Sequence, residues 1–205
     1  FELCNENSPI LFKDEKNFKT LVTQLQKGIN FLHSKNVCHF DIKPENITFC
    51  SYYKHFKYID FGYAELYPFV QYIEYGPRGT PDFIPLTGNA YFMDNLTKDI
   101  KCPYVECNDW VPQNKSVYAS NYVFHKKSYP ELAYKCDTYS FGKTLYYIYT
   151  YLLYVNNNID NIFKRRTEKL IYDLINCDII VRPYISNVNL KEYYNINLKN
   201  LVDLP

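Results

Sequence analysis

Two neighbouring polar segments constrain this sequence more than any other feature. Residues 39–46 read HFDIKPEN, and residues 60–62 read DFG. They contain two aspartates, a lysine and an asparagine that we expect to lie on adjoining loops. Such a group can hold a divalent metal ion, a phosphate and a hydroxyl nucleophile together, and phosphoryl transfer depends mainly on this kind of positioning and charge stabilisation. The two segments therefore predict a phosphoryl-transfer site.

The residues around these segments show clear periodicity. Apolar residues recur three and four positions apart, which predicts an amphipathic helix from Asp14 to about residues 33–36; they are Phe18, Leu21, Val22, Leu25, Ile29 and Leu32. Short apolar stretches at 46–50 and 57–59, with polar residues between them, predict a small hairpin. The first polar segment should thus lie between a helix and a hairpin.

The second half of the chain has weaker signals. Residues 62–134 are rich in Pro, Gly, Asn and Tyr and show no sustained period, so we expect mostly loop there. Helical patterns return at 137–154 and 166–175, and Pro183 marks a boundary after Arg182. The longest apolar run, 141–155, includes Lys143 and is shorter than the ~20 residues of a membrane-spanning helix. A buried core helix and no membrane span are expected.

Composition excludes some classes of partner. The chain has 205 residues, 47% of them hydrophobic, and a net charge of +1. The apolar content suffices for a folded core, and the balanced charge provides no field to attract nucleic acid or an anionic membrane. We expect no nucleic-acid partner.

The cysteines and the aromatic content suggest a setting. The seven cysteines are scattered and odd in number, which favours reduced thiols in the cytoplasm. Cys102 and Cys107 lack two further ligands at zinc-motif spacing. The 19% aromatic content, with 23 Tyr, is typical of AT-rich coding sequences, as in some large DNA viruses and protists. For a viral protein the location would be the host cytoplasm.

The two polar segments resemble the catalytic and metal-binding loops of eukaryotic-type protein kinases, whose patterns are H-R-D-x-K-x-x-N and D-F-G. The resemblance implies an α+β fold class: a mainly α-helical C-terminal lobe of the kinase fold, with a small β-hairpin bearing the catalytic and metal loops. It also implies a Ser/Thr protein kinase that uses ATP and Mg²⁺ and acts on a protein substrate with a Ser or Thr hydroxyl.

The resemblance assigns a role to each motif residue. Asp41 would accept the proton of the substrate hydroxyl, and Lys43 would neutralise the transferring phosphate. Asn46 and Asp60 would be the metal ligands. Thr80, in Gly-Thr-Pro, would bridge toward Asp41 and Lys43.

Other positions carry weaker matches. Residues 1–4 resemble the hinge between kinase lobes, where the Glu2 carbonyl and the Cys4 amide would bind adenine. Asp137 resembles a buried aspartate that braces the catalytic loop, although a carboxylate at a predicted helix start is ordinarily a cap. His39 is expected to be a core histidine that supports the loop rather than a base. Arg182 resembles a late arginine that anchors the activation segment.

The sequence also departs from the family pattern. Phe40 stands where the family has an arginine, so no cation is available there for an activation-loop phosphate. Between Tyr63 and Gly79 there is no Ser or Thr, and we expect aromatic packing to hold this segment, with Tyr63, Tyr67, Phe69 and Tyr72. The expected A-P-E reads Pro85-Leu86 without an acid; a second register at residues 130–132 would restore a P-E pair but lies only five residues before Asp137.

These matches define one unit. We expect residues 1–205 to form a kinase C-lobe with a hinge at 1–4, a catalytic loop at 39–46, an activation segment at 60–87, an insertion at 88–134 and helices at 135–205. Because the chain begins at the expected hinge, the N-lobe should be absent from it. A catalytically silent, kinase-like scaffold that binds a protein partner is the alternative to an enzyme. The intact Asp41, Lys43, Asn46 and Asp60 favour the enzyme.

Overall fold

The computed structural model describes residues 14–66, 79–83, 129–176 and 181–194. The predicted hinge, with Glu2 and Cys4, and most of the predicted insertion lie outside these ranges. Among the helices that are described, none combines the length and hydrophobicity needed to span a bilayer.

Helix α1, Glu15–Ser34, confirms the first predicted helix. The Asp14 side chain caps it by accepting a hydrogen bond of 2.8 Å from the backbone amide of Asn17, which satisfies one of the unpaired first-turn donors. Five of the six periodic apolar side chains are fully buried: Phe18, Leu21, Val22, Leu25 and Ile29. The apolar stripe therefore faces the core, as its spacing predicts.

The strands form two small antiparallel sheets. Strands β2, Ile47–Cys50, and β3, His55–Tyr58, confirm the predicted hairpin, in which Ile47 pairs with Tyr58. Strands β1, Val37–Cys38, and β4, Glu65–Leu66, form a second sheet that the sequence did not indicate. Short 3-10 helices follow at η2, Pro44–Asn46, and η3, Pro81–Phe83.

Helix α4, Tyr129–Val155, begins eight residues before the predicted helix. The expected loop and insertion therefore end before residue 129 rather than at 134, and residues 130–132 lie within the helix. Helix α5, Asn161–Leu174, also begins earlier than predicted, because the Asp160 carboxylate caps it through the Phe163 amide at 2.9 Å. The chain continues through η6, Ile185–Asn187, and α6, Leu190–Tyr194.

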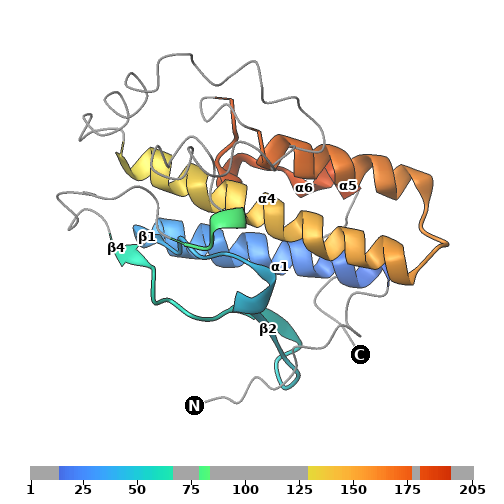
Figure 1. Ribbon diagram of the computed structural model, residues 1–205, viewed down its shortest axis with the longest axis horizontal. Coiled ribbons are helices and arrows are strands. Elements are labelled where there is room, and N and C mark those ends of the chain that lie inside the picture. The colour runs from blue at the N-terminus through green and yellow to red at the C-terminus, as the bar shows by residue number, and fades with distance from the viewer. Residues whose placement is uncertain (1–13, 67–78, 84–128, 177–180, 195–205) are drawn as a thin grey trace.

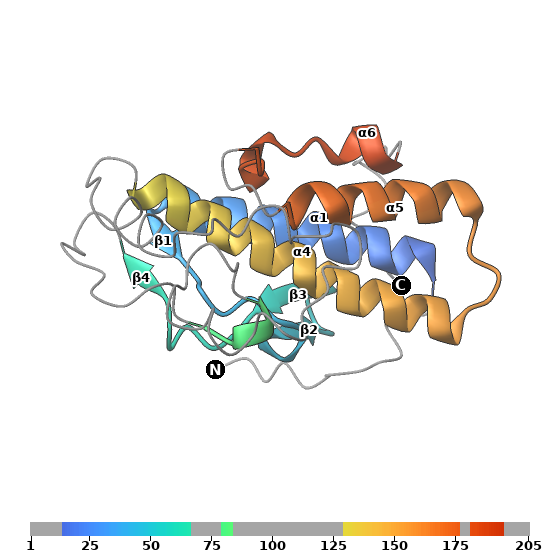
Figure 2. The same cartoon turned by 45° about the horizontal axis from the view of Figure 1, so that its top comes forward.

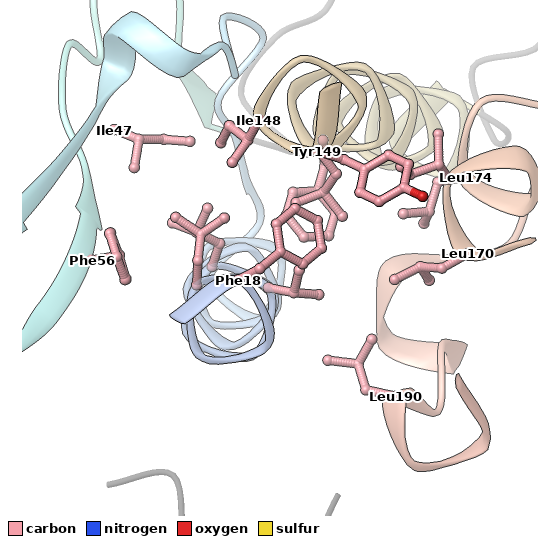
Figure 3. Close-up of a cluster of buried hydrophobic side chains, with 14 of the residues drawn as sticks. Phe18, Ile47, Phe56, Ile148, Tyr149, Leu170, Leu174 and Leu190 are labelled. Carbon is pink, nitrogen blue, oxygen red and sulfur yellow. The ribbon is translucent and has the colours of Figure 1, made fainter. Parts of the chain in front are cut away.

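Helices α1 and α4 lie side by side through the middle of the molecule (Figure 1). The hairpin packs on one side of this pair, while α5 and α6 lie on the other (Figure 2). Phe18 of α1, Tyr149 of α4 and Leu170 of α5 belong to one buried cluster where these three helices pack together (Figure 3). This packed core supports the loops that carry the polar motif.

Candidate active site

The Asp41 carboxylate is the centre of a closed hydrogen-bond group. Its Oδ1 accepts from the backbone amide of Thr80 at 2.9 Å and from the Thr80 hydroxyl at 2.7 Å. Its Oδ2 lies 2.8 Å from Nζ of Lys43 and accepts from Nδ2 of Asn46 at 2.8 Å. Lys43 also donates to the Thr80 hydroxyl at 2.7 Å. Lys43 and Asn46, from the same segment as Asp41, and the distant Thr80 thus meet at one buried carboxylate.

This environment fixes the charge of Asp41. Burial alone would raise the pKa of the carboxyl group, but hydrogen bonds from Lys43 and Thr80 and the lysine charge favour the ionised form. The pKa is therefore lowered below its usual value. At neutral pH the group is therefore a carboxylate.

The turn between Asp41 and β2 positions the asparagine. Pro44 begins η2, and the Asn46 amide closes the turn onto the Lys43 carbonyl at 3.0 Å. The Asn46 side chain donates to the Asp41 carbonyl at 2.9 Å as well as to its carboxylate. Because Nδ2 is committed to Asp41, the amide oxygen is the atom with which Asn46 could bind a cation.

The hairpin brings Asn46 and Asp60 to the same end of the two strands. Asn46 precedes β2, Asp60 follows β3, and the amide of Ile59 donates to the Asn46 carbonyl at 2.9 Å. Asp60 is exposed, has a φ of +59°, and accepts a hydrogen bond of 3.2 Å from the Gly62 amide through Oδ1. An asparagine oxygen and an exposed carboxylate are hard oxygen donors, so this pair fits Mg²⁺.

Asp137 braces the catalytic loop from below. Its carboxylate is fully buried, and it accepts from the backbone amides of His39 and Phe40 at 2.9 Å each. Nε2 of His33 on α1 lies 2.9 Å from the same carboxylate. Since α4 begins at Tyr129, Asp137 is an interior residue, and the cap hypothesis is wrong. The side chain holds the loop backbone, in agreement with the resemblance.

Two further polar residues on α4 extend this brace. Ser140 donates to the Phe83 carbonyl at 2.7 Å, and Thr144 donates to the Ile42 carbonyl at 3.2 Å. With Asp137 they are spaced three and four residues apart, so all three lie on one helix face. Sequence reasoning missed Ser140, Thr144 and His33; the polar stripe within an otherwise apolar helix was the available signal for the first two.

Phe40 occupies an apolar pocket. Its side chain is 5% exposed and packs in a cluster with Cys38, Ala133 and Cys136. Its φ of +60° is uncommon for a residue with a bulky side chain, and the Asp137 bond to its amide helps to hold it there. Among the described residues, the side chains that cluster with Phe40, where the family pattern has an arginine, carry no cation.

Gly79 fits directly over Phe40. It has a φ of +136°, and a Cβ there would overlap the Phe40 carbonyl oxygen. Only glycine allows both this conformation and this approach. The close contact delivers Thr80 to Asp41.

His39 is a core histidine, as expected. It is fully buried, and its ring contacts those of Tyr58 and Phe61 at centroid distances of 5.5 and 4.8 Å. Its Nδ1 accepts from the Asp41 amide at 3.3 Å. The ring therefore supports the backbone at Asp41 and links the catalytic loop to the 60–62 turn.

Arg182 is a buried anchor. Its guanidinium donates to the carbonyls of Asn176 and Lys135 and lies 4.9 Å over the Tyr139 ring. These contacts join α4 to the turn after α5. The contacts of the predicted activation segment from 67 to 78, with Tyr67, Phe69 and Tyr72, lie outside the described residues. Tyr63 is 46% exposed, so it does not show the expected packing.

Comparisons with known proteins match the first part of the chain. The protein kinase domain family matches residues 2–85. Serine/threonine-protein kinase chk1 of Schizosaccharomyces pombe is 40% identical over 68 residues, which are 33% of this chain and 14% of that protein. Human death-associated protein kinase 2 is 38% identical over 74 residues, 34% of this chain and 20% of that protein.

A third relative gives the same result. Human serine/threonine-protein kinase ULK3 is 42% identical over 52 residues, 25% of this chain and 11% of that protein. The chain thus spans a fifth or less of the length of these relatives. The matched region includes the catalytic loop and the 60–62 turn, whose geometry is described above. The family match over residues 2–85 and these relatives support the assignment of this chain to the eukaryotic-type protein kinase superfamily.

Proposed function

We propose that this chain is part of a Ser/Thr protein kinase, which transfers the γ-phosphate of ATP to a Ser or Thr hydroxyl of a protein. The observation that carries the proposal is the Asp41 carboxylate, ionised and bound by Lys43, Asn46 and Thr80. The Asp41 carboxylate and the Lys43 ammonium group lie 2.8 Å apart. Such a pair suits a reaction in which a hydroxyl loses a proton while an anionic phosphate is transferred.

The Thr80 hydroxyl indicates where an acceptor hydroxyl would bind. It lies 2.7 Å from both Oδ1 of Asp41 and Nζ of Lys43, so the group already accommodates one aliphatic hydroxyl between a base and a cation. A substrate hydroxyl that reached the same carboxylate would give its proton to Asp41 as its oxygen bonds to phosphorus, and the bond from phosphorus to ADP would break. Lys43 would balance the negative charge of the transferred group.

Asn46 and Asp60 would hold Mg²⁺ at the open end of the hairpin, and Glu2 and Cys4 would hold adenine. Mg-ATP, when bound, supplies the phosphoryl group and part of the charge neutralisation. The buried brace of Asp137 fixes the loop before substrate arrives, so less reorganisation is needed at the moment of transfer. We place the enzyme in the cytoplasm.

The test is ATP-dependent phosphorylation of mixed protein substrates by the full-length protein, followed by identification of the modified residues by mass spectrometry. We expect phosphoserine and phosphothreonine that depend on Mg²⁺. If a folded, full-length protein transferred no phosphate, the result would contradict the kinase proposal and favour the catalytically silent scaffold.

A further inference from the structure

Three metal-binding side chains meet beneath the catalytic loop, away from Asn46 and Asp60. Nε2 of His33, Sγ of Cys38 and a carboxylate oxygen of Asp137 lie within 4.8 Å of one another. They come from α1, β1 and α4. Cys38 and Asp137 are fully buried, whereas the His33 side chain is 12% exposed and connects the cluster with solvent. We propose that His33, Cys38 and Asp137 form a binding site for Zn²⁺.

The donor set fits this ion. Zinc binds imidazole nitrogen and carboxylate oxygen at about 2.0–2.2 Å and thiolate sulfur at about 2.3 Å, which sets ligand atoms in a tetrahedral site about 3.3–3.8 Å apart. Nε2 of His33 and Oδ2 of Asp137 are already 2.9 Å apart. The site therefore forms by a slight separation of this pair and an approach of the Cys38 sulfur. A mixture of nitrogen, sulfur and oxygen donors excludes Mg²⁺ as the preferred ion.

Charge and protons balance in the bound state. The Cys38 thiol gives its proton to solvent, and His33 binds through Nε2 while its proton resides on Nδ1. One thiolate and one carboxylate then neutralise the two positive charges of the ion, so the buried site carries no net charge. Solvent would supply the fourth ligand from the side of His33.

Binding there leaves the brace of the catalytic loop in place. Asp137 holds the Phe40 amide through Oδ1 and the His39 amide through Oδ2, and the cation would replace the contact between Asp137 and His33. The ion would then join α1, β1 and α4 at one point. We expect zinc to raise the thermal midpoint of unfolding, since it binds the folded state.

Cobalt is the spectroscopic probe. Full-length protein is stripped with a chelator and titrated with Co²⁺, and we expect one equivalent to give a sulfur-to-cobalt charge-transfer band and tetrahedral d–d bands that Zn²⁺ removes. Cys38→Ala should abolish the charge-transfer band. The control is Cys50→Ala, a buried cysteine on β2 outside the cluster, which should retain it.

A second variant keeps the test decisive if Cys38→Ala fails to fold. His33→Gln retains an N–H donor for Asp137 but removes the imidazole ligand, and we expect at least ~100-fold weaker cobalt binding, beyond the loss seen when outer-shell partners are removed. Unchanged affinity in His33→Gln would overturn the proposal, as would a folded wild-type protein that binds no cobalt. A charge-transfer band that persists in Cys38→Ala would place the sulfur ligand elsewhere, Cys102 and Cys107 included, and would also overturn it. None of these readouts depends on kinase activity.

Discussion

Oδ1 of Asp137 accepts a hydrogen bond of 2.9 Å from the backbone amide of Phe40, a residue held at a φ of +60°. Helix α4 thus fixes a strained point of the catalytic loop one residue before Asp41. The same carboxylate binds the His39 amide, so two consecutive loop residues depend on it.

We therefore expect Asp137→Asn to lower both stability and activity. The amide would present N–H groups to a site that is surrounded by donors, leaving at least one of them unpaired. The cost should be about 2–4 kcal/mol of unfolding free energy, measured by urea titration. The control is Asp173→Asn on α5, which has partly exposed ion-pair and hydrogen-bond partners and should cost less. An Asp137→Asn variant as stable and active as wild type would contradict the brace.

Substitutions at two glycines should distinguish loss of the contact between Thr80 and Asp41 from loss of packing between α4 and α5. Gly79→Ala should displace Thr80 from Asp41, because the new methyl group overlaps the Phe40 carbonyl, and kcat should fall at least ~10-fold.

In Gly142→Ala the methyl group would lie 2.7 Å from side-chain atoms of Leu174 and Ile175, where α4 crosses α5. That variant should lose about 1–3 kcal/mol of stability through overpacking. If both variants lost stability and activity to the same extent, Gly79 would not act mainly on the site, nor Gly142 mainly on packing.

Phe40 leads to a prediction about regulation. Because its pocket is apolar, an activation-segment phosphate would find no cation at this position, and we expect the full-length enzyme to keep its activity after phosphatase treatment. Dephosphorylation is verified by mass spectrometry before the assay. Loss of most activity, with recovery on rephosphorylation between residues 63 and 80, would contradict this prediction.

Phe40→Arg should destabilise the protein by burying an unpaired charge.

Tyr193 and Tyr194 of α6 predict that the unfolding free energy falls at alkaline pH. Burial raises the pKa of Tyr194, which is 6% exposed, and burial and the hydrogen bond to Asp173 raise that of Tyr193. In the unfolded chain both ionise near pH ~10, so above that pH the unfolded state binds fewer protons than the folded state and the unfolding free energy decreases. Chemical unfolding at pH 8 and pH 10.5 measures the change. Tyr194→Phe should reduce it, and an identical pH dependence in that variant would contradict the assignment.

Local sequence signals predicted those parts of the fold that depend on local interactions. The apolar spacing from Phe18 to Ile29 specified α1, and polar residues between two apolar stretches specified the hairpin. The starts of α4 and α5 were missed although Pro130 in the first turn and Asp160 as a cap are standard signals of helix starts. The β1–β4 pair has only two residues in each strand, too few for a period to appear.

The candidate site shows the same division. The motif spacing brought Asp41, Lys43, Asn46 and Thr80 together correctly, because each lies on a short segment of defined geometry. The contribution of His33 depends on the packing of α1 beside α4, which joins residues 104 positions apart. Nothing in the local sequence around His33 indicates that contact.

The central claim is that Asp41 accepts the proton of the substrate hydroxyl. The most direct measurement compares kcat for a protein substrate between full-length wild type, Asp41→Asn and Asp82→Asn, with folding verified by circular dichroism. Asp82 is an exposed aspartate in η3, two residues beyond Thr80, and serves as the matched control. We predict at least a ~10²-fold decrease for Asp41→Asn and little change for Asp82→Asn. Near-wild-type turnover by a folded Asp41→Asn enzyme would contradict the claim.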